Sequence, residues 1–288
     1  MPPTLLITGG TGYLGYHLIK LAKSWHTHAT FFQTPPPTSS PAIFHQCDLT
    51  EKDQVHKLII SVKPDVIIHT ACSNKSSKEI DAIFPAAHHL STIAHQQSIK
   101  FLHLSTDLVF DGTLAPYQET DIPNPLHPYG KAKTEAEQIV SLYCPAAIII
   151  RSSLMYGIDP LDHQTRWLVR GMDTGEPVRL FTDERRSPIW VHTLAEALLE
   201  LTNMDFQGIL HLAGPETMNR WDFGLAILTL LGRGATSNIQ TSTIETSGMI
   251  RPKDLAFTID TARQLLNTPL LSISEVTNQL REEKPRNR

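Results

Sequence analysis

A tyrosine and a lysine four residues apart, Tyr129 and Lys133, form a pattern that could support catalysis. On an α-helix this spacing places both side chains on one face, within contact distance. A nearby ammonium group favours the phenolate and lowers the tyrosine pKa, as a general acid working near neutral pH requires. Pro128 before Tyr129 fits the start of a helix. An ordinary amphipathic helix can show the same spacing, so the pair alone leaves both interpretations open.

Three polar residues, Ser105, Thr106 and Asp107, follow directly on an apolar run at 101–104. At the carboxyl end of a parallel strand, such side chains face the crevice in which α/β folds bind ligands. A hydroxyl group at that position could hold a carbonyl oxygen. A polar strand end without a binding role is the alternative.

Three glycines near the start of the chain, Gly9, Gly12 and Gly15, stand between an apolar run at 5–8 and a helical pattern at 14–23. In a strand–turn–helix unit, Gly9 would permit the tight turn, Gly12 would let a pyrophosphate approach the backbone, and Gly15 would let the helix pack closely. The amino terminus of the helix would direct its free N–H groups at the phosphates. A purely structural turn is the alternative.

Strand-like and helix-like segments alternate through the first half of the chain. The strand-like runs are 5–8, 27–33, 43–46, 66–69, 101–104 and 147–150, and further helical patterns lie at about 51–62, 79–97 and 129–143. Nearly all-apolar strands that alternate with helices indicate a parallel sheet covered on both faces. We therefore expect an α/β fold with a doubly wound parallel sheet, the Rossmann arrangement.

The alternation becomes weaker in the second half of the chain. Residues 157–188 look polar and irregular, 191–201 helical and 209–213 strand-like, and the tail from 215 onward looks helical, most strongly at 221–231. We predict an NAD(P)-binding Rossmann domain over 1–156, completed by about 188–213. The segments 157–187 and 214–288 would form a smaller C-terminal substrate-binding domain at the carboxyl ends of the strands.

Composition argues against several classes of function. With 25 basic and 29 acidic residues the net charge is −4, so no basic field favours nucleic acid or an anionic membrane. No apolar run approaches the roughly 20 residues of a membrane span, and the motif at Gly9 leaves no room for a signal peptide. The cysteines, Cys47, Cys72 and Cys144, lie far apart. We therefore expect no metal site and a reducing, cytoplasmic location.

Taken together, the motifs resemble those of the extended short-chain dehydrogenase/reductase family. The residues are T-G-x-x-G-x-x-G at 8–15, S-T-D-x-V-F-D-G at 105–112, P-Y-G-x-x-K at 128–133 and R-P-K-D at 251–254. More narrowly they are similar to the dTDP-4-dehydrorhamnose reductase branch. That branch also contains the regulatory beta subunit of methionine adenosyltransferase, which binds NADP but serves as a partner protein.

The resemblance implies a role for each residue that matches a family motif. Thr106 would polarise the substrate carbonyl, Tyr129 would donate the proton, and Lys133 would bind the nicotinamide ribose. Leu154 stands where the reductases carry tryptophan, and leucine cannot stack on a sugar or base as tryptophan would. Arg186 lies where relatives contact the nucleotide diphosphate. The expected coenzyme-binding residues are Gly9, Thr11, Gly12, Tyr13, Leu14, Gly15, Asp48, Leu49, Thr70, Ala71, Cys72, Tyr129 and Lys133, and the expected substrate-binding residues are Thr106, Asp107, Tyr129, Leu154 and Arg186.

By this resemblance the protein is an NAD(P)H-dependent reductase of a nucleotide-activated 4-keto sugar, with dTDP-4-dehydro-L-rhamnose as the expected substrate. The alternatives are a sugar-nucleotide epimerase or dehydratase of the wider family, and a non-catalytic NADP-binding regulatory subunit.

The region expected to meet the coenzyme ribose carries no charge. No acidic residue occurs from Ser24 through Cys47, so nothing there repels a 2′-phosphate, although no cation lies between Lys23 and Lys52. We expect NADP(H) to be preferred mildly and NAD(H) to be tolerated, and we leave a homodimer open.

Overall fold

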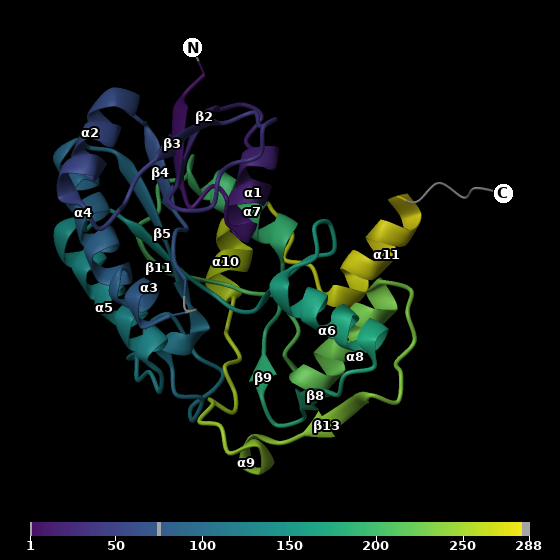
Figure 1. Cartoon of the computed structure of the whole chain (residues 1–288). Helices are drawn as coiled ribbons and strands as arrows, with labels where there is room; N and C mark the ends of the chain where they lie inside the picture. Colours follow the sequence, from purple (N-terminus) through teal and green to yellow (C-terminus); the bar gives the residue numbers. More distant parts are fainter. Residues whose placement is uncertain (1, 74–75, 284–288) are drawn as a thin grey trace.

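Seven parallel strands form the central sheet of the protein, in the order β11-β6-β5-β4-β1-β2-β3 (Figure 1). This computed structural model describes residues 2–73 and 76–283. The strands are β1 (Thr4–Thr8), β2 (His26–Phe31), β3 (Ile43–Gln46), β4 (Val66–His69), β5 (Lys100–Thr106), β6 (Ile148–Ser152) and β11 (Gly208–Leu212). Every residue of β4 and β6 is buried, as expected for strands covered on both faces. The predicted fold class is confirmed.

Helices cover both faces of this sheet (Figure 1). One face packs on α2 (Lys52–Val62), α4 (Ile83–Gln96) and α5 (Pro128–Tyr143), and the other on α1 (Tyr13–Leu21), α7 (Val191–Leu201) and α10 (Asp260–Leu265). The helix predicted at 79–97 is two helices, because α3 (Ser77–Asp81) ends before α4 begins. Pro85 explains the break, since proline lacks an N–H group and is tolerated only in the first turn of a helix.

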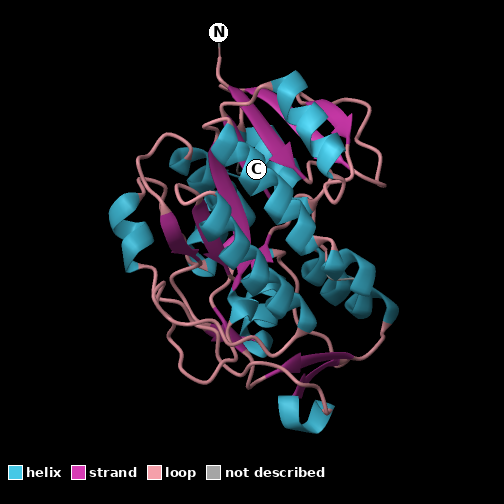
Figure 2. Ribbon diagram, turned by 90° about the vertical axis from the view of Figure 1, so that its left-hand side faces the viewer, coloured by secondary structure: helices cyan, strands magenta, loops and turns pink. Residues whose placement is uncertain are grey.

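A second, smaller group of helices and strands lies beside the sheet (Figures 1 and 2) and has a hydrophobic core of its own. It contains α6 (His163–Thr174), β8 (Val178–Phe181), α8 (Arg220–Leu230), β13 (Ile239–Ser242) and α11 (Ile273–Glu283). The shorter elements are η1 (Asp107–Val109), β7 (Met155–Tyr156), β9 (Arg185–Arg186), β10 (Ile189–Trp190), β12 (Met218–Asn219) and α9 (Ile244–Ser247). Within the described ranges, no helix is long and apolar enough to span a bilayer.

Two predictions for the second half of the chain were wrong. The segment expected to be irregular contains α6 and β8, and the tail expected to be helical contains β12 and β13. Sequence analysis missed the α6 helix because most of its residues are polar, and it buries only Thr165, Leu168 and Gly171. The β13 strand pairs in parallel with β8, about 60 residues earlier, so no local sequence pattern predicts this strand. The division into two domains at the stated boundaries stays a prediction.

Candidate functional site

The candidate site lies at the carboxyl ends of β1, β4 and β5, where the strand order reverses between β1 and β4. Ligands of open α/β sheets bind in the crevice at such a switch point. The turn after β1 carries the glycine motif, the turn after β4 carries Thr70, Ala71 and Cys72, and β5 ends at Thr106. The topology therefore brings three of the predicted segments to one edge of the sheet.

Close packing explains the glycines of the turn after β1. Gly9 has a φ of +76°, which is the conformation that glycine adopts most readily. A Cβ atom at Gly15 would lie 2.2 Å from the Gly9 carbonyl oxygen, so only glycine lets α1 begin this close to the turn. Gly12 is exposed, and no side chain caps the amino terminus of α1 behind it. The free backbone N–H groups of this helix end fit the pyrophosphate of a dinucleotide.

The other predicted coenzyme residues have structural contacts of their own. The Thr70 hydroxyl donates to the Thr8 carbonyl oxygen at 2.7 Å, and the Tyr13 hydroxyl donates to the Pro160 carbonyl oxygen at 3.2 Å. Asp48 Oδ1 accepts from the Thr50 backbone and hydroxyl at 3.0 and 2.7 Å. Leu14 and Leu49 are buried in the cores on the two faces of the sheet, whereas Thr11 is half-buried. Their roles toward a coenzyme stay predictions.

Tyr129 and Lys133 both lie in α5, close to the turn that follows Thr106. A Cβ atom at Gly130 would lie 2.2 Å from the Leu108 carbonyl oxygen, so the helix begins directly against that turn. The Tyr129 hydroxyl lies 3.6 Å from Cys72 Sγ. The helix thus places Tyr129 between the turn after β4 and the end of β5.

The expected effect of Lys133 on Tyr129 is absent from this structure. Burial raises the pKa of Tyr129 well above its ordinary value, and Cys72 and the Asp107 carboxylate act in the same direction. The Lys133 amine instead donates to the Leu104 carbonyl oxygen at 2.6 Å, and burial lowers its pKa. The prediction that Lys133 lowers the Tyr129 pKa was wrong because desolvation of the phenol dominates.

An ion pair joins Asp107 to Arg186 beside Thr106. Arg186 Nη2 donates to Asp107 Oδ1 at 2.9 Å, and Arg186 Nε lies 2.8 Å from Oδ2. The Ser153 hydroxyl donates to the same carboxylate at 2.7 Å. Asp107 is 1% exposed and Arg186 9%. Burial raises the pKa of Asp107, while Arg186 and the hydrogen bond from Ser153 oppose that rise.

Replacing Arg186 with Ala should lower the free energy of unfolding by about 3 to 5 kcal/mol, because the variant leaves the buried Asp107 carboxylate without its partner. Arg185→Ala is the matched control, since the Arg185 side chain is 53% exposed and lies 3.5 Å from Asp254. That exposed pair should contribute less than about 1 kcal/mol. Urea unfolding of both variants measures the difference, and equal stability of the two would contradict the assignment.

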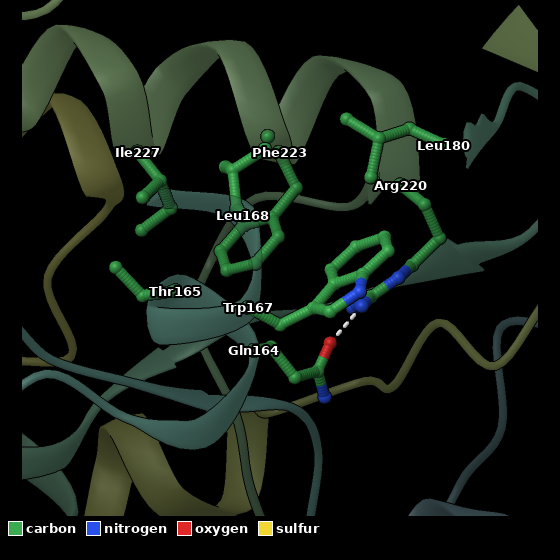
Figure 3. A pocket seen from close by; sticks show the side chains of 9 residues that line it. Gln164, Thr165, Trp167, Leu168, Leu180, Arg220, Phe223 and Ile227 are labelled. Atoms are coloured by element: carbon green, nitrogen blue, oxygen red, sulfur yellow. Dashed lines mark hydrogen bonds between the residues drawn. The ribbon is translucent and has the colours of Figure 1, made fainter. Parts of the chain in front are cut away.

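More guanidinium groups gather around Glu184 at the edge of this ion pair. Arg251 Nη1 lies 3.0 Å from the Glu184 carboxylate and Arg186 Nη1 lies 3.7 Å from it. The Arg220 backbone N–H donates to the Glu184 carbonyl oxygen at 3.0 Å, and burial lowers the pKa of Arg220 to about 10. Figure 3 shows the Arg220 side chain bonded to Gln164. The guanidinium groups of Arg186, Arg220 and Arg251 outnumber the two carboxylates beside them, Glu184 and Asp107.

The structure places Leu154 in the smaller core, 7% exposed, so its role in substrate binding stays a prediction.

Sequence analysis missed a buried ion pair behind β5. Arg151 contacts the Glu137 carboxylate through Nη2 at 2.8 Å, and the Ser105 hydroxyl donates to that carboxylate. Glu137 lies one helical turn after Lys133, and Arg151 directly follows the apolar run 147–150, so their positions could have suggested this ion pair. The contacts of Glu137 with Arg151 and Ser105 join α5 to the carboxyl ends of β6 and β5.

His69 and His103 were overlooked because each stands inside a run that looked like a plain apolar strand. Their rings lie 5.1 Å apart beneath α5. In the described part of the chain, no group of three or more His, Cys, Asp or Glu residues is placed to hold a metal ion.

Comparisons with known proteins match nearly the whole chain. A family model described as the RmlD substrate binding domain matches residues 3–279. A "probable low-salt glycan biosynthesis reductase" of Haloferax volcanii is 30% identical over 243 residues, which cover 80% of this chain and 81% of that protein. Methionine adenosyltransferase 2 subunit beta of Danio rerio is 29% identical over 238 residues, which cover 77% of this chain and 72% of that protein.

A solved structure has the same fold as this chain. It is dTDP-4-dehydrorhamnose reductase from Bacillus anthracis in complex with NADP, with a TM-score of 0.83. The match covers 98% of this chain and 100% of that chain at 23% sequence identity.

Proposed function

The chain belongs to the RmlD substrate binding domain family, and from this premise we propose that it is an NAD(P)-dependent oxidoreductase that reduces a nucleotide-activated 4-keto sugar. The observation that carries the proposal is the arrangement of Thr106, Tyr129 and the glycine turn around one switch point of the sheet. Among 4-keto sugars we propose dTDP-4-dehydro-L-rhamnose, which would become dTDP-L-rhamnose.

The residues around the switch point fit a nicotinamide dinucleotide. The amino terminus of α1 behind Gly12 would hold the pyrophosphate, and Lys133 would hold the nicotinamide ribose. When bound, this coenzyme supplies the hydride for the ketone carbon. No acidic residue occurs from Ser24 through Cys47, which includes the end of β2, so a 2′-phosphate would meet no repulsion. This supports a mild preference for NADPH over NADH.

Tyr129 and Thr106 would act on the carbonyl oxygen of the substrate. A phenol is protonated at neutral pH even at its ordinary pKa, and burial raises the pKa of Tyr129 further, so Tyr129 holds a proton when negative charge develops on that oxygen. Tyr129 Oη would give this proton to the oxygen while the Thr106 hydroxyl holds it in place. The Leu108 N–H donates to Thr106 Oγ1 at 3.3 Å, and the Thr106 hydroxyl itself donates to Asp107 Oδ1 at 3.3 Å. To hold the carbonyl oxygen of a substrate, this hydroxyl would turn its hydrogen away from the carboxylate.

The guanidinium cluster suits the diphosphate of a nucleotide sugar. Planar guanidinium groups recognise phosphate oxygens through paired N–H groups. Arg186 pairs with Asp107 and Arg251 with Glu184, but the Arg251 side chain is 41% exposed against 11% for Arg186, so Arg251 is better placed to receive an anion from solvent. Both residues contact the Glu184 carboxylate, and Arg186 also contacts Asp107, directly after the end of β5.

A second candidate function is that of a non-catalytic, NADP-binding regulatory subunit. The similarity to methionine adenosyltransferase 2 subunit beta supports it, because that relative matches nearly as well as the reductase of Haloferax volcanii. The two candidates make opposite predictions for turnover. A cytoplasmic location and a homodimer stay predictions.

A turnover assay with both coenzymes tests the proposal. The purified protein should oxidise NADPH when dTDP-4-dehydro-L-rhamnose is added, and it should accept NADH less well. A preference for NADH above about tenfold, or 1.4 kcal/mol, would overturn the coenzyme assignment. Tight NADP binding without oxidation of NADPH by any 4-keto nucleotide sugar would favour the regulatory subunit instead.

A further inference from the structure

Two buried histidines lie beneath the lysine of the candidate site. His69 ends β4, His103 lies in β5, and the two residues are direct neighbours in the register of the sheet. Their rings lie 5.1 Å apart on the face that α5 covers. Both side chains are buried, with exposed fractions of 3% and 0%. Neither has a role in the reaction as described above.

The Lys133 ammonium depends on neutral acceptors. Its Nζ atom lies 2.6 Å from the Leu104 carbonyl oxygen and 3.4 Å from His103 Nε2, and the residue is 2% exposed. The nearest carboxylate on the same helix, Glu137, already binds Arg151 and Ser105. A buried ammonium group is costly unless each N–H finds an acceptor. His103 therefore supplies an acceptor that no carboxylate supplies.

The hydrogen bond from Lys133 determines which nitrogen of the His103 ring carries the proton. An ammonium group only donates, so His103 Nε2 accepts and its proton lies on Nδ1. The Ala71 N–H donates to the Thr8 hydroxyl at 3.4 Å, and the Thr8 hydroxyl is hydrogen-bonded to His69 Nδ1 at 2.7 Å. Burial lowers the pKa of His69 to about 3 and that of His103 well below its ordinary value, so both rings are neutral.

We propose that His103 is a positioning residue that holds the Lys133 ammonium at the coenzyme crevice, and that Thr8 and His69 support its ring from behind. Thr8 directly precedes the glycine turn, so these contacts join the two segments expected to bind the pyrophosphate and the ribose. The inference rests on the proposed function only in assigning Lys133 to the coenzyme. Lys133, His69, Glu137 and Cys72 are the titratable groups that face this contact.

Substitutions at His103 separate positioning from simple packing. Leu removes the acceptor, Gln places an oxygen near the position of Nε2, and Asn is too short to reach it. NADPH affinity, followed by coenzyme fluorescence, should fall about tenfold to a hundredfold in His103→Leu and His103→Asn, the range for a lost hydrogen bond to a charge. His103→Gln should keep most of the affinity. NADPH affinity should be lost at high pH, where the Lys133 ammonium gives up its proton. In the Leu variant this loss should occur at a lower pH, because an ammonium group without its acceptor releases its proton more easily.

His211→Leu is the matched control, because His211 is a buried histidine of β11 in the same sheet. It should leave the NADPH affinity and its pH dependence unchanged. Wild-type affinity in His103→Leu, or an equal loss in the Leu, Gln and Asn variants, would overturn the proposal. If the Leu variant does not fold, the comparison of Gln with Asn still decides. Binding is measured without substrate, so an absence of turnover would count against the reductase and not against this role of His103.

Discussion

Replacing Tyr129 with Phe should lower kcat at least about a hundredfold, with NADPH affinity little changed. The substitution removes one hydroxyl group and keeps the ring. General acid catalysis typically contributes 10²–10⁴-fold, and about a hundredfold corresponds to roughly 2.7 kcal/mol of activation free energy. The lost proton donor acts only when charge develops on the carbonyl oxygen, so kcat and kcat/KM should fall together. Steady-state kinetics with saturating NADPH measure the effect.

The Tyr129 variant should remain folded. The tyrosine hydroxyl has Cys72 Sγ as its contact, at 3.6 Å, so little stability is lost with it. Tyr143→Phe is a matched control, because Tyr143 is the last residue of the same helix and is partly exposed. That variant should keep wild-type kcat. A Tyr129 variant with more than about a tenth of wild-type kcat would rule out the assigned proton donor, since the loss would fall below the usual range for general acid catalysis.

Acidification below pH 6.5 should destabilise the protein steeply. Burial lowers the pKa of His17 to about 4, that of His69 and His211 to about 3, and that of His103 well below its ordinary value. In the unfolded chain each would titrate near 6.5. Because the folded-state values lie lower, unfolding takes up protons below pH 6.5. The stabilisation from each neutral ring is complete above that pH and is lost as the pH falls toward 4.

The loss should be large enough to measure before most carboxylates titrate. His17, His69 and His211 should each remove about 2 kcal/mol between pH 6.5 and pH 5, a large part together of the roughly 5–15 kcal/mol that stabilises a typical domain, and His103 should act in the same direction. Urea unfolding at several pH values gives the slope. His17→Phe should reduce the slope by about one proton, whereas His95→Gln, at an exposed position on α4, should not change it. A free energy of unfolding that stays constant from pH 6.5 to 5 would contradict this prediction.

The local patterns of the sequence predicted much of the first half of the chain. The apolar runs became β1 to β6, and the segment 191–201 became α7 with the predicted bounds. The glycine turn also has the predicted conformation, with Gly9 at positive φ and Gly15 against the turn. These features depend on periodicity and on close backbone contacts within a few residues, and both are visible in the order of the residues.

Only the tertiary structure decided which residues that are distant in sequence pair with each other. Arg186, which the resemblance placed at the nucleotide diphosphate, pairs with Asp107, 79 residues away. His103 lies in a strand as predicted, and it also contacts Lys133, 30 residues away. The spacing of Tyr129 and Lys133 predicted a lowered tyrosine pKa, whereas burial raises it. A sequence pattern shows which groups can share a helix face or a strand end. The sign of a pKa shift and the partner of a charge depend on desolvation and on packing between distant segments, which exist only in the folded chain.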